Sequence, residues 1–223
     1  MYQPKKLKIN LNSLSLNQEL LISFGVALLC LFLGLFFPSQ NSAQLITKNI
    51  FFLILLPTIY ARIILKMKLP ELGLNLKNRH AGLVWSSVLA LFLLLTFYLL
   101  LNYTSFRTNY KLSPEIMSNF WFFLGYELLL VNFIVFINEF FFRGFILSLF
   151  REKLTYWAIA LQALIYFLAL WLTNSFSWQI LPFILFSVSG GILAYKTKSF
   201  LYSYFMHFFV IIILDSVLIY LAR

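Results

Sequence analysis

One apolar stretch of the chain carries side chains that could do chemistry. Residues 133–150 are apolar enough to lie in lipid, yet Asn138, Glu139 and Arg143 stand in the middle of them. An ionised side chain at bilayer depth costs ~2–3 kcal/mol or more, so such residues are rare and are usually paired or functional. The four-residue spacing places Glu139 and Arg143 on one helix face. The pair is therefore either an internal salt bridge or part of a site in which Glu139 acts as a base.

A histidine far along the chain is expected at the same depth. His207 lies about eight residues into the last apolar stretch, and Glu139 lies about nine residues before the end of its own helix. Both distances are counted from the side predicted to be cytoplasmic, so a cluster of Glu139, Arg143 and His207 is feasible. The alternative for His207 is a lone membrane histidine that bonds to a backbone carbonyl.

Two other acids in the apolar stretches are not assigned to this cluster. At 1.5 Å per residue, Asp215 lies about 12 Å along its helix from His207, which is too far for direct contact. Glu127 lies about 16 Å from Asn138, so it cannot supply a carboxylate at the level of that residue.

The composition predicts an all-α fold, a polytopic transmembrane helix bundle. Hydrophobic residues make up 62% of the 223 positions and charged residues 11%, far from the soluble range. The net charge of +10 fits basic loops beside a membrane, so lipid is an expected partner and nucleic acid is not. The single Cys30 forms no internal disulfide, and two histidines are too few for a typical zinc site. No cofactor and no metal are expected.

About seven spans are predicted, in a single domain over residues 1–223. The first is read as an uncleaved span, and Pro57 predicts a kink in the second. Ser113, Pro114 and Glu115 predict a helix start. The long fourth element must be tilted, kinked or partly interfacial, and Gly125 is one place where it could break. The spans are expected at 20–37, 50–65, 82–103, within 113–150, and at 155–172, 178–195 and 200–222.

Loop charge predicts the orientation of the bundle. The N-terminal segment, the 62–80 stretch, the 143–153 region and the 196–198 turn hold thirteen of the 17 Lys and Arg residues. Along the chain these segments lie at every second end of the predicted spans, so they share one side of the membrane. Their excess of Lys and Arg predicts that this side is the cytoplasm. The N-terminus is then cytoplasmic, seven spans place the C-terminus outside, and the plasma membrane is the expected location.

The motif around Glu139 resembles a known family. The sequence Asn138-Glu139-Phe-Phe-Phe-Arg143-Gly is similar to the Glu-Glu-x-x-x-Arg motif of the CPBP family, which contains the CAAX prenyl endopeptidases and the bacteriocin-processing and self-immunity proteins. Three further features agree, and the resemblance covers about residues 69–215. They are the 69–74 loop, Phe167 at the place of a Phe-x-x-x-His motif, and the 196–199 turn followed by His207 at the place of a His-x-x-x-Asn motif.

The resemblance also marks what this chain lacks. In the family the first Glu is understood to act as a general base on water, beside the second-motif His, while the third-motif His and Asn steady the oxyanion. At the corresponding positions this chain has Asn138, Trp171 and Ile211, and it retains Glu139, Arg143 and His207 of the candidate catalytic set. An amide, an indole and an aliphatic side chain cannot act as bases near neutral pH.

Three functions remain open from the sequence. The first is a CPBP-type membrane protein with a decayed catalytic site that acts as a scaffold, an immunity factor or a binding partner of a membrane peptide or protein. The second is an active CAAX-type intramembrane endopeptidase that uses Glu139 and His207. The third is a component of a transporter or channel, although the chain shows no inverted repeat.

Overall fold

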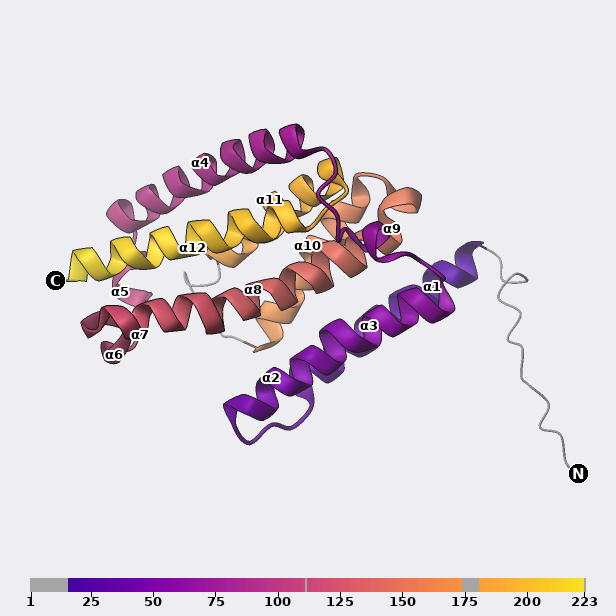
Figure 1. Cartoon of the computed structure of the whole chain (residues 1–223), viewed down its shortest axis with the longest axis horizontal. Helices are drawn as coiled ribbons and strands as arrows, with labels where there is room; N and C mark the ends of the chain where they lie inside the picture. The colour runs from indigo at the N-terminus through magenta and orange to yellow at the C-terminus, as the bar shows by residue number, and fades with distance from the viewer. Residues whose placement is uncertain (1–15, 111, 174–180, 223) are drawn as a thin grey trace, which may run out of the picture.

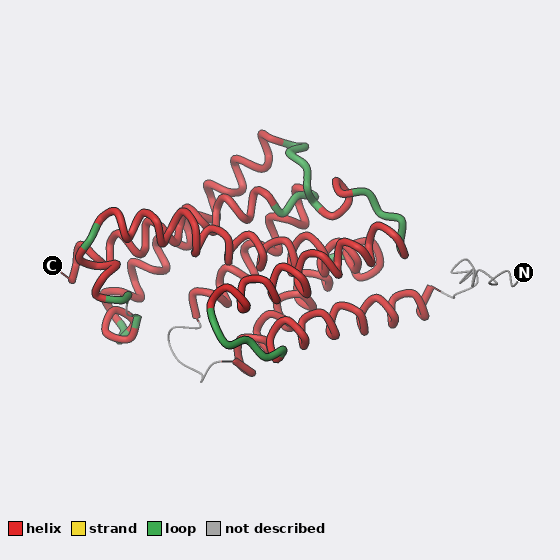
Figure 2. Tube along the Cα trace, turned by 60° about the horizontal axis from the view of Figure 1, so that its bottom comes forward, coloured by secondary structure: helices red, strands yellow, loops and turns green. Residues whose placement is uncertain are grey.

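The helices of this protein run mainly along the longest axis of the molecule (Figure 1). The computed structural model describes residues 16–110, 112–173 and 181–222, and every regular element within these ranges is helical (Figure 2). The all-α helical bundle expected from the composition is confirmed.

Among the described residues, five helices are long and apolar enough to cross a membrane, and the chain is an integral membrane protein. They are Gln18–Phe36, Ser42–Ile64, Arg79–Tyr103, Phe120–Leu154 and Leu201–Ala222. At the fifth and sixth predicted spans the structure has two shorter apolar helices, α10 (Trp157–Thr173) and α11 (Leu181–Thr197). Most of the polar turn expected at 173–175 and the expected start of the sixth span at Trp178 lie outside the described residues.

The first two spans form a pair at one side of the bundle. Helix α1 (Leu16–Phe36) packs against the second span, which begins with α2 (Ser42–Ile50). The Asn41 side chain caps α2 by accepting a hydrogen bond from the backbone N–H of Gln44 at 2.9 Å. Around Pro57, where a kink was predicted, the four-residue α3 (Leu56–Ile59) lies between π-helical turns at Phe51–Leu55 and Tyr60–Ile64.

A short loop leads from this pair to the third span. It contains a 3-10 turn at Leu69–Leu72, and Gly73 follows with a φ of 83°, a left-handed conformation that glycine adopts without strain. Helix α4 (Arg79–Tyr103) then crosses the bundle, and α5 (Phe106–Asn109) follows it.

The fourth element breaks at Asn119 and not at Gly125, the place considered from the sequence. The predicted start is correct, because Ser113 precedes α6 (Pro114–Ser118). Asn119 then leaves the helical region at φ −125° and ψ 116°, and its side chain caps a new helix by accepting from the backbone N–H groups of Trp121 and Phe122. Gly125 keeps helical angles inside that helix, at φ −61° and ψ −43°.

The new helix continues without interruption over 35 residues. It consists of α7 (Phe120–Gly125), α8 (Asn132–Glu139) and α9 (Leu147–Leu154), joined by π-helical turns at Tyr126–Val131 and Phe140–Ile146. We refer to residues 120–154 as the long helix.

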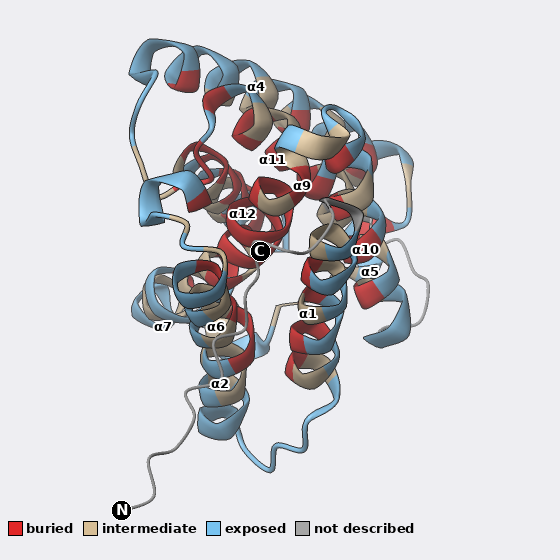
Figure 3. Ribbon diagram, turned by 90° about the vertical axis from the view of Figure 1, so that its right-hand side faces the viewer, coloured by how far each residue is buried: buried red, intermediate tan, exposed pale blue. Residues whose placement is uncertain are grey.

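Helix α12 (Leu201–Ala222) occupies the centre of the bundle. It packs against α4, α8 and α11, and α11 in turn packs against α10. In Figure 3 the buried residues gather around α12, whereas much of α4 is exposed. Because α12 and the long helix carry His207 and Glu139, this packing decides whether the predicted cluster forms.

The basic loops meet at one end of the bundle. The Ser199 hydroxyl donates a hydrogen bond to the Gly73 carbonyl at 3.0 Å, and the Lys153 ammonium lies 3.7 Å from the Glu19 carboxylate. At the other end, the Arg107 guanidinium donates to the Leu221 carbonyl. Where they are described, the segments predicted to share a side of the membrane therefore lie at the same end of the bundle.

Candidate functional site

The π-helical turn Phe140–Ile146 places Arg143 in the middle of the bundle. Every residue of this turn is buried, and turns of this kind often occur at functional sites. Gly144 allows two other segments to approach closely, because a Cβ there would lie 3.0 Å from the Leu72 carbonyl oxygen and 3.0 Å from the Phe200 ring. The loop before α4 and the start of α12 are thus packed directly against the motif.

The Glu139 carboxylate is fully enclosed and has three partners. Its Oε1 atom lies 2.8 Å from Nδ1 of His207 and 3.5 Å from Nη1 of Arg143, and its Oε2 atom accepts a hydrogen bond of 2.5 Å from the Ser203 hydroxyl. The Glu139 side chain has no exposed surface. The structure therefore brings together Glu139, Arg143 and His207, the three retained positions of the motif.

Arg143 joins the long helix to two neighbours. Its Nη2 atom donates a hydrogen bond of 2.9 Å to the Phe186 carbonyl on α11, and its guanidinium lies 5.2 Å from the centre of the Tyr166 ring on α10. Gly190 on α11 makes room for it, because a Cβ there would lie 3.2 Å from Nε of Arg143. The cation is thus held by a carboxylate, a carbonyl dipole and an aromatic face.

His207 is fixed between Glu139 and an aromatic ring. Its imidazole stacks on Phe186, with the two ring centres 3.8 Å apart. Because a carboxylate only accepts hydrogen bonds, the close contact with Glu139 assigns the ring proton to Nδ1. The Nε2 atom is then an acceptor, and it is buried without a hydrogen-bond partner among the described residues.

The three substituted positions lie in different surroundings. Asn138 is half-buried next to Glu139, and Ile211 is buried one helical turn beyond His207 in an apolar cluster. Trp171 lies on the surface of α10, with 56% of its side chain exposed. The residue of α10 that contacts Arg143 is Tyr166, one position before Phe167.

Four contributors to this cluster were not predicted from the sequence: Ser203, Tyr166, Phe186 and Gly190. Ser203 lies four residues before His207, so helical spacing puts both on the same face of α12, and that signal was available. Phe186 and Gly190 come from α11, and their part depends on how α11 packs against the long helix and α12. No spacing within α11 indicates this contact.

The arrangement is suited to holding charge more than to moving protons. General-base catalysis requires a carboxylate beside a water molecule, whereas both oxygens of the fully buried Glu139 already have close partners. Within the described residues, no group of three or more His, Cys, Asp or Glu could hold a metal ion. The one unused polar atom of His207 is Nε2.

A comparison with known protein families finds a match that includes the Glu139 motif. Residues 118–213 match the family model described as type II CAAX prenyl endopeptidase Rce1-like. This part of the membrane protein is similar to the type II CAAX prenyl endopeptidases of that model. The matched segment runs from the cap of the long helix to α12 and includes every residue of the Glu139 cluster. No curated protein and no solved structure gives a significant match to the chain.

Proposed function

We propose that this CAAX-endopeptidase-like protein does not hydrolyse peptide bonds and that it binds a membrane peptide or protein, as a scaffold or an immunity factor. The main support for this proposal is the burial of Glu139 and the contacts of its carboxylate. Its carboxylate is fully buried and is shared by Arg143, Ser203 and His207. A water molecule positioned for attack would have to displace one of these partners.

The neighbouring positions support the same proposal. Asn138 stands where the resemblance implies a general base, and an amide has no titrating proton near neutral pH. Ile211 stands where it implies an oxyanion donor, and an aliphatic side chain donates nothing. The retained residues thus serve to hold the long helix, α11 and α12 together.

A groove between α4 and α12 is the surface that we assign to the partner. It has a volume of about 510 Å³, within the usual range for small-molecule sites, and its lining is mainly apolar. Ala90 and Leu94 on α4 and Phe205 and Phe209 on α12 contribute to it. An apolar or prenylated segment of a membrane peptide fits this chemistry.

A second candidate function rests on one atom. The Nε2 atom of His207 is buried without a partner and could accept a proton from a reacting group. In that case the Glu139–His207 pair would form a rearranged proteolytic site. This alternative requires a water molecule and an oxyanion donor at Nε2.

Binding of a fluorescent prenylated peptide to the protein in nanodiscs tests the proposed role. We expect saturable binding and an intact peptide in mass spectrometry. Ala90→Phe should weaken binding by filling the groove, whereas Ala43→Phe in the groove beside α2, of about 580 Å³, should not. No saturable binding, or equal binding by both variants, would contradict the proposed binding site.

A further inference from the structure

A second polar centre joins the long helix to α12, away from the Glu139 cluster. It consists of Glu127 on the long helix and Asp215 on α12, each only 1% exposed. The two carboxyl groups lie within hydrogen-bonding reach of each other. Glu127 is twelve residues from Glu139, or about 18 Å along a helix, so the two centres are separate.

The buried atoms of this pair lack donors. Both oxygens of Glu127 and Oδ1 of Asp215 are enclosed and have no hydrogen-bond partner among the described residues. Among the described residues, the other titratable groups facing the pair are Tyr110, whose phenol interacts with the Asp215 carboxyl, and Tyr126. Neither is a cation. With no counter-charge among the described residues, two facing carboxylates repel each other and also bear the full cost of burial.

Tyr110 distinguishes the two acids. Burial is the main cause of the raised pKa of the Tyr110 phenol, and the nearby acids are a smaller one. The hydroxyl therefore stays protonated and can donate a hydrogen bond to Asp215. Asp215 therefore has a donor and can carry the negative charge, whereas Glu127 has none. A proton on Glu127 removes its charge and supplies a second donor to Asp215.

We propose that Glu127 and Asp215 form a proton-binding site, in which one proton resides on Glu127 and is donated in a hydrogen bond to Asp215. Asp215 lies two positions beyond the segment that matches the family model. The site fastens the end of α12 opposite to the end near Ser203 and His207. The bound proton thus helps to hold together the two helices that carry Glu139 and His207.

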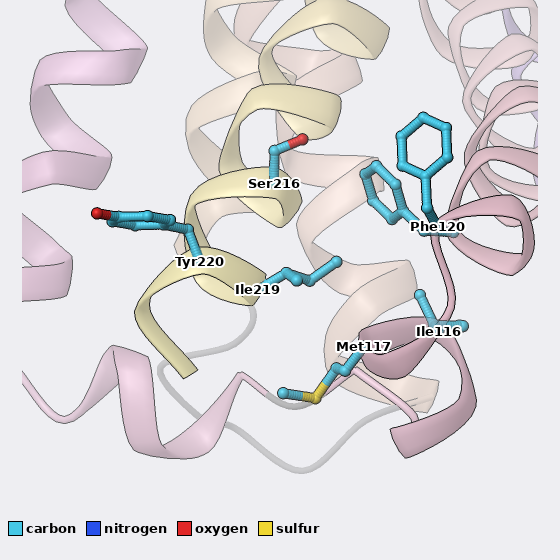
Figure 4. A pocket seen from close by; sticks show the side chains of 7 residues that line it. Ile116, Met117, Phe120, Ser216, Ile219 and Tyr220 are labelled. Atoms are coloured by element: carbon cyan, nitrogen blue, oxygen red, sulfur yellow. The ribbon is translucent and has the colours of Figure 1, made fainter. Parts of the chain in front are cut away.

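Two cavities lie near this site at the end of the bundle, and neither is lined by Glu127 or Asp215. One, of about 290 Å³, is lined by Tyr110 and Leu218. The other, of about 250 Å³, lies between α12 and the α6–α7 segment, and Ser216, the neighbour of Asp215, lines it (Figure 4). Both cavities include Met117 and Ile219, so they adjoin each other.

Infrared spectroscopy of the whole protein in nanodiscs at neutral pH tests the proposal, because a protonated carboxyl has a C=O stretch that a carboxylate lacks. We expect this band in the unmodified protein and its loss in Glu127→Gln. The control is Glu115→Gln, at an exposed acid, which should keep the band. An absent band, or one that survives Glu127→Gln, would overturn the proposal.

Thermal stability provides a second measurement. A glutamine amide reproduces the donor of a protonated Glu127, so Glu127→Gln should keep the melting temperature of the unmodified protein, whereas Glu127→Ala should lower it. A large drop in Glu127→Gln would overturn the proposal. So would stabilisation by Na⁺ that disappears in this variant, because the ligand would then be a metal cation.

Discussion

Nδ1 of His207 lies 2.8 Å from Oε1 of Glu139, although 68 positions of sequence separate the two residues. This contact joins α12 to the long helix inside the bundle, and Arg143 extends it to α11. The motif residues thus form a connection between three helices. Their effect on stability follows from that connection, and it can be measured without knowledge of a substrate.

Glu139 and Arg143 should be energetically coupled. Removing one member of a buried ion pair leaves the other unpaired, so Glu139→Gln and Arg143→Gln should each lower the free energy of unfolding by about 3–5 kcal/mol. The double variant should recover part of this loss. Denaturant unfolding in detergent measures the cycle, and additive losses would show that the two side chains do not interact.

Ser203 should matter because its hydroxyl binds the Glu139 carboxylate. A hydrogen bond to a charged group contributes about 1.5–3 kcal/mol, so Ser203→Ala should destabilise the protein by that amount. The control is Ser87→Ala, at an exposed serine of α4, which should leave the unfolding midpoint unchanged. Equal effects of the two changes would contradict the Ser203–Glu139 bond.

Two glycines of the long helix should respond to alanine in opposite directions. Gly144→Ala places a Cβ 3.0 Å from the Leu72 carbonyl and the Phe200 ring, so we expect a loss of about 1–3 kcal/mol. Gly125 has nothing within 4 Å of that position, and an alanine in a helix is favoured by up to about 1 kcal/mol. Thermal melts of both variants in detergent check this contrast. A tolerated Gly144→Ala would contradict the close packing of the 69–74 loop on the motif.

The orientation predicted from loop charge can be tested with reporter fusions. A reporter that is active only in the cytoplasm should give a signal at the N-terminus and none after Arg223. The reason is the distribution of Lys and Arg: besides the buried Arg143, twelve lie in the segments predicted to be cytoplasmic and four lie on the other side. Signal at both ends would require an even number of spans.

Much of the fold and of the cluster could be predicted from the sequence. Apolar length predicted the helices, and the i,i+4 spacing with matching depths indicated that Glu139, Arg143 and His207 could meet. The helix breaks elsewhere than at Gly125, because a glycine inside a helix is tolerated, whereas an asparagine that caps the residues following it starts a new helix. Asn119 carried that signal.

Contacts between helices distant in sequence were not predictable in the same way. Helical spacing relates Glu127 and Asp215 only to residues on their own helices, and it does not indicate that the two acids face each other. Their contact depends on the antiparallel register of the long helix and α12. Once Glu139 is placed beside His207, that register also places Glu127 and Asp215 in the same part of the bundle.

The proposed function requires that Glu139 stabilise the bundle and not activate water. Incubation of the purified protein with prenylated and unprenylated peptides tests this requirement, with Glu139→Ala and His207→Ala run beside the unmodified protein. We expect no cleavage product from any of the three. Cleavage by the unmodified protein that disappears in both variants would contradict the claim and establish an active site built on Glu139 and His207.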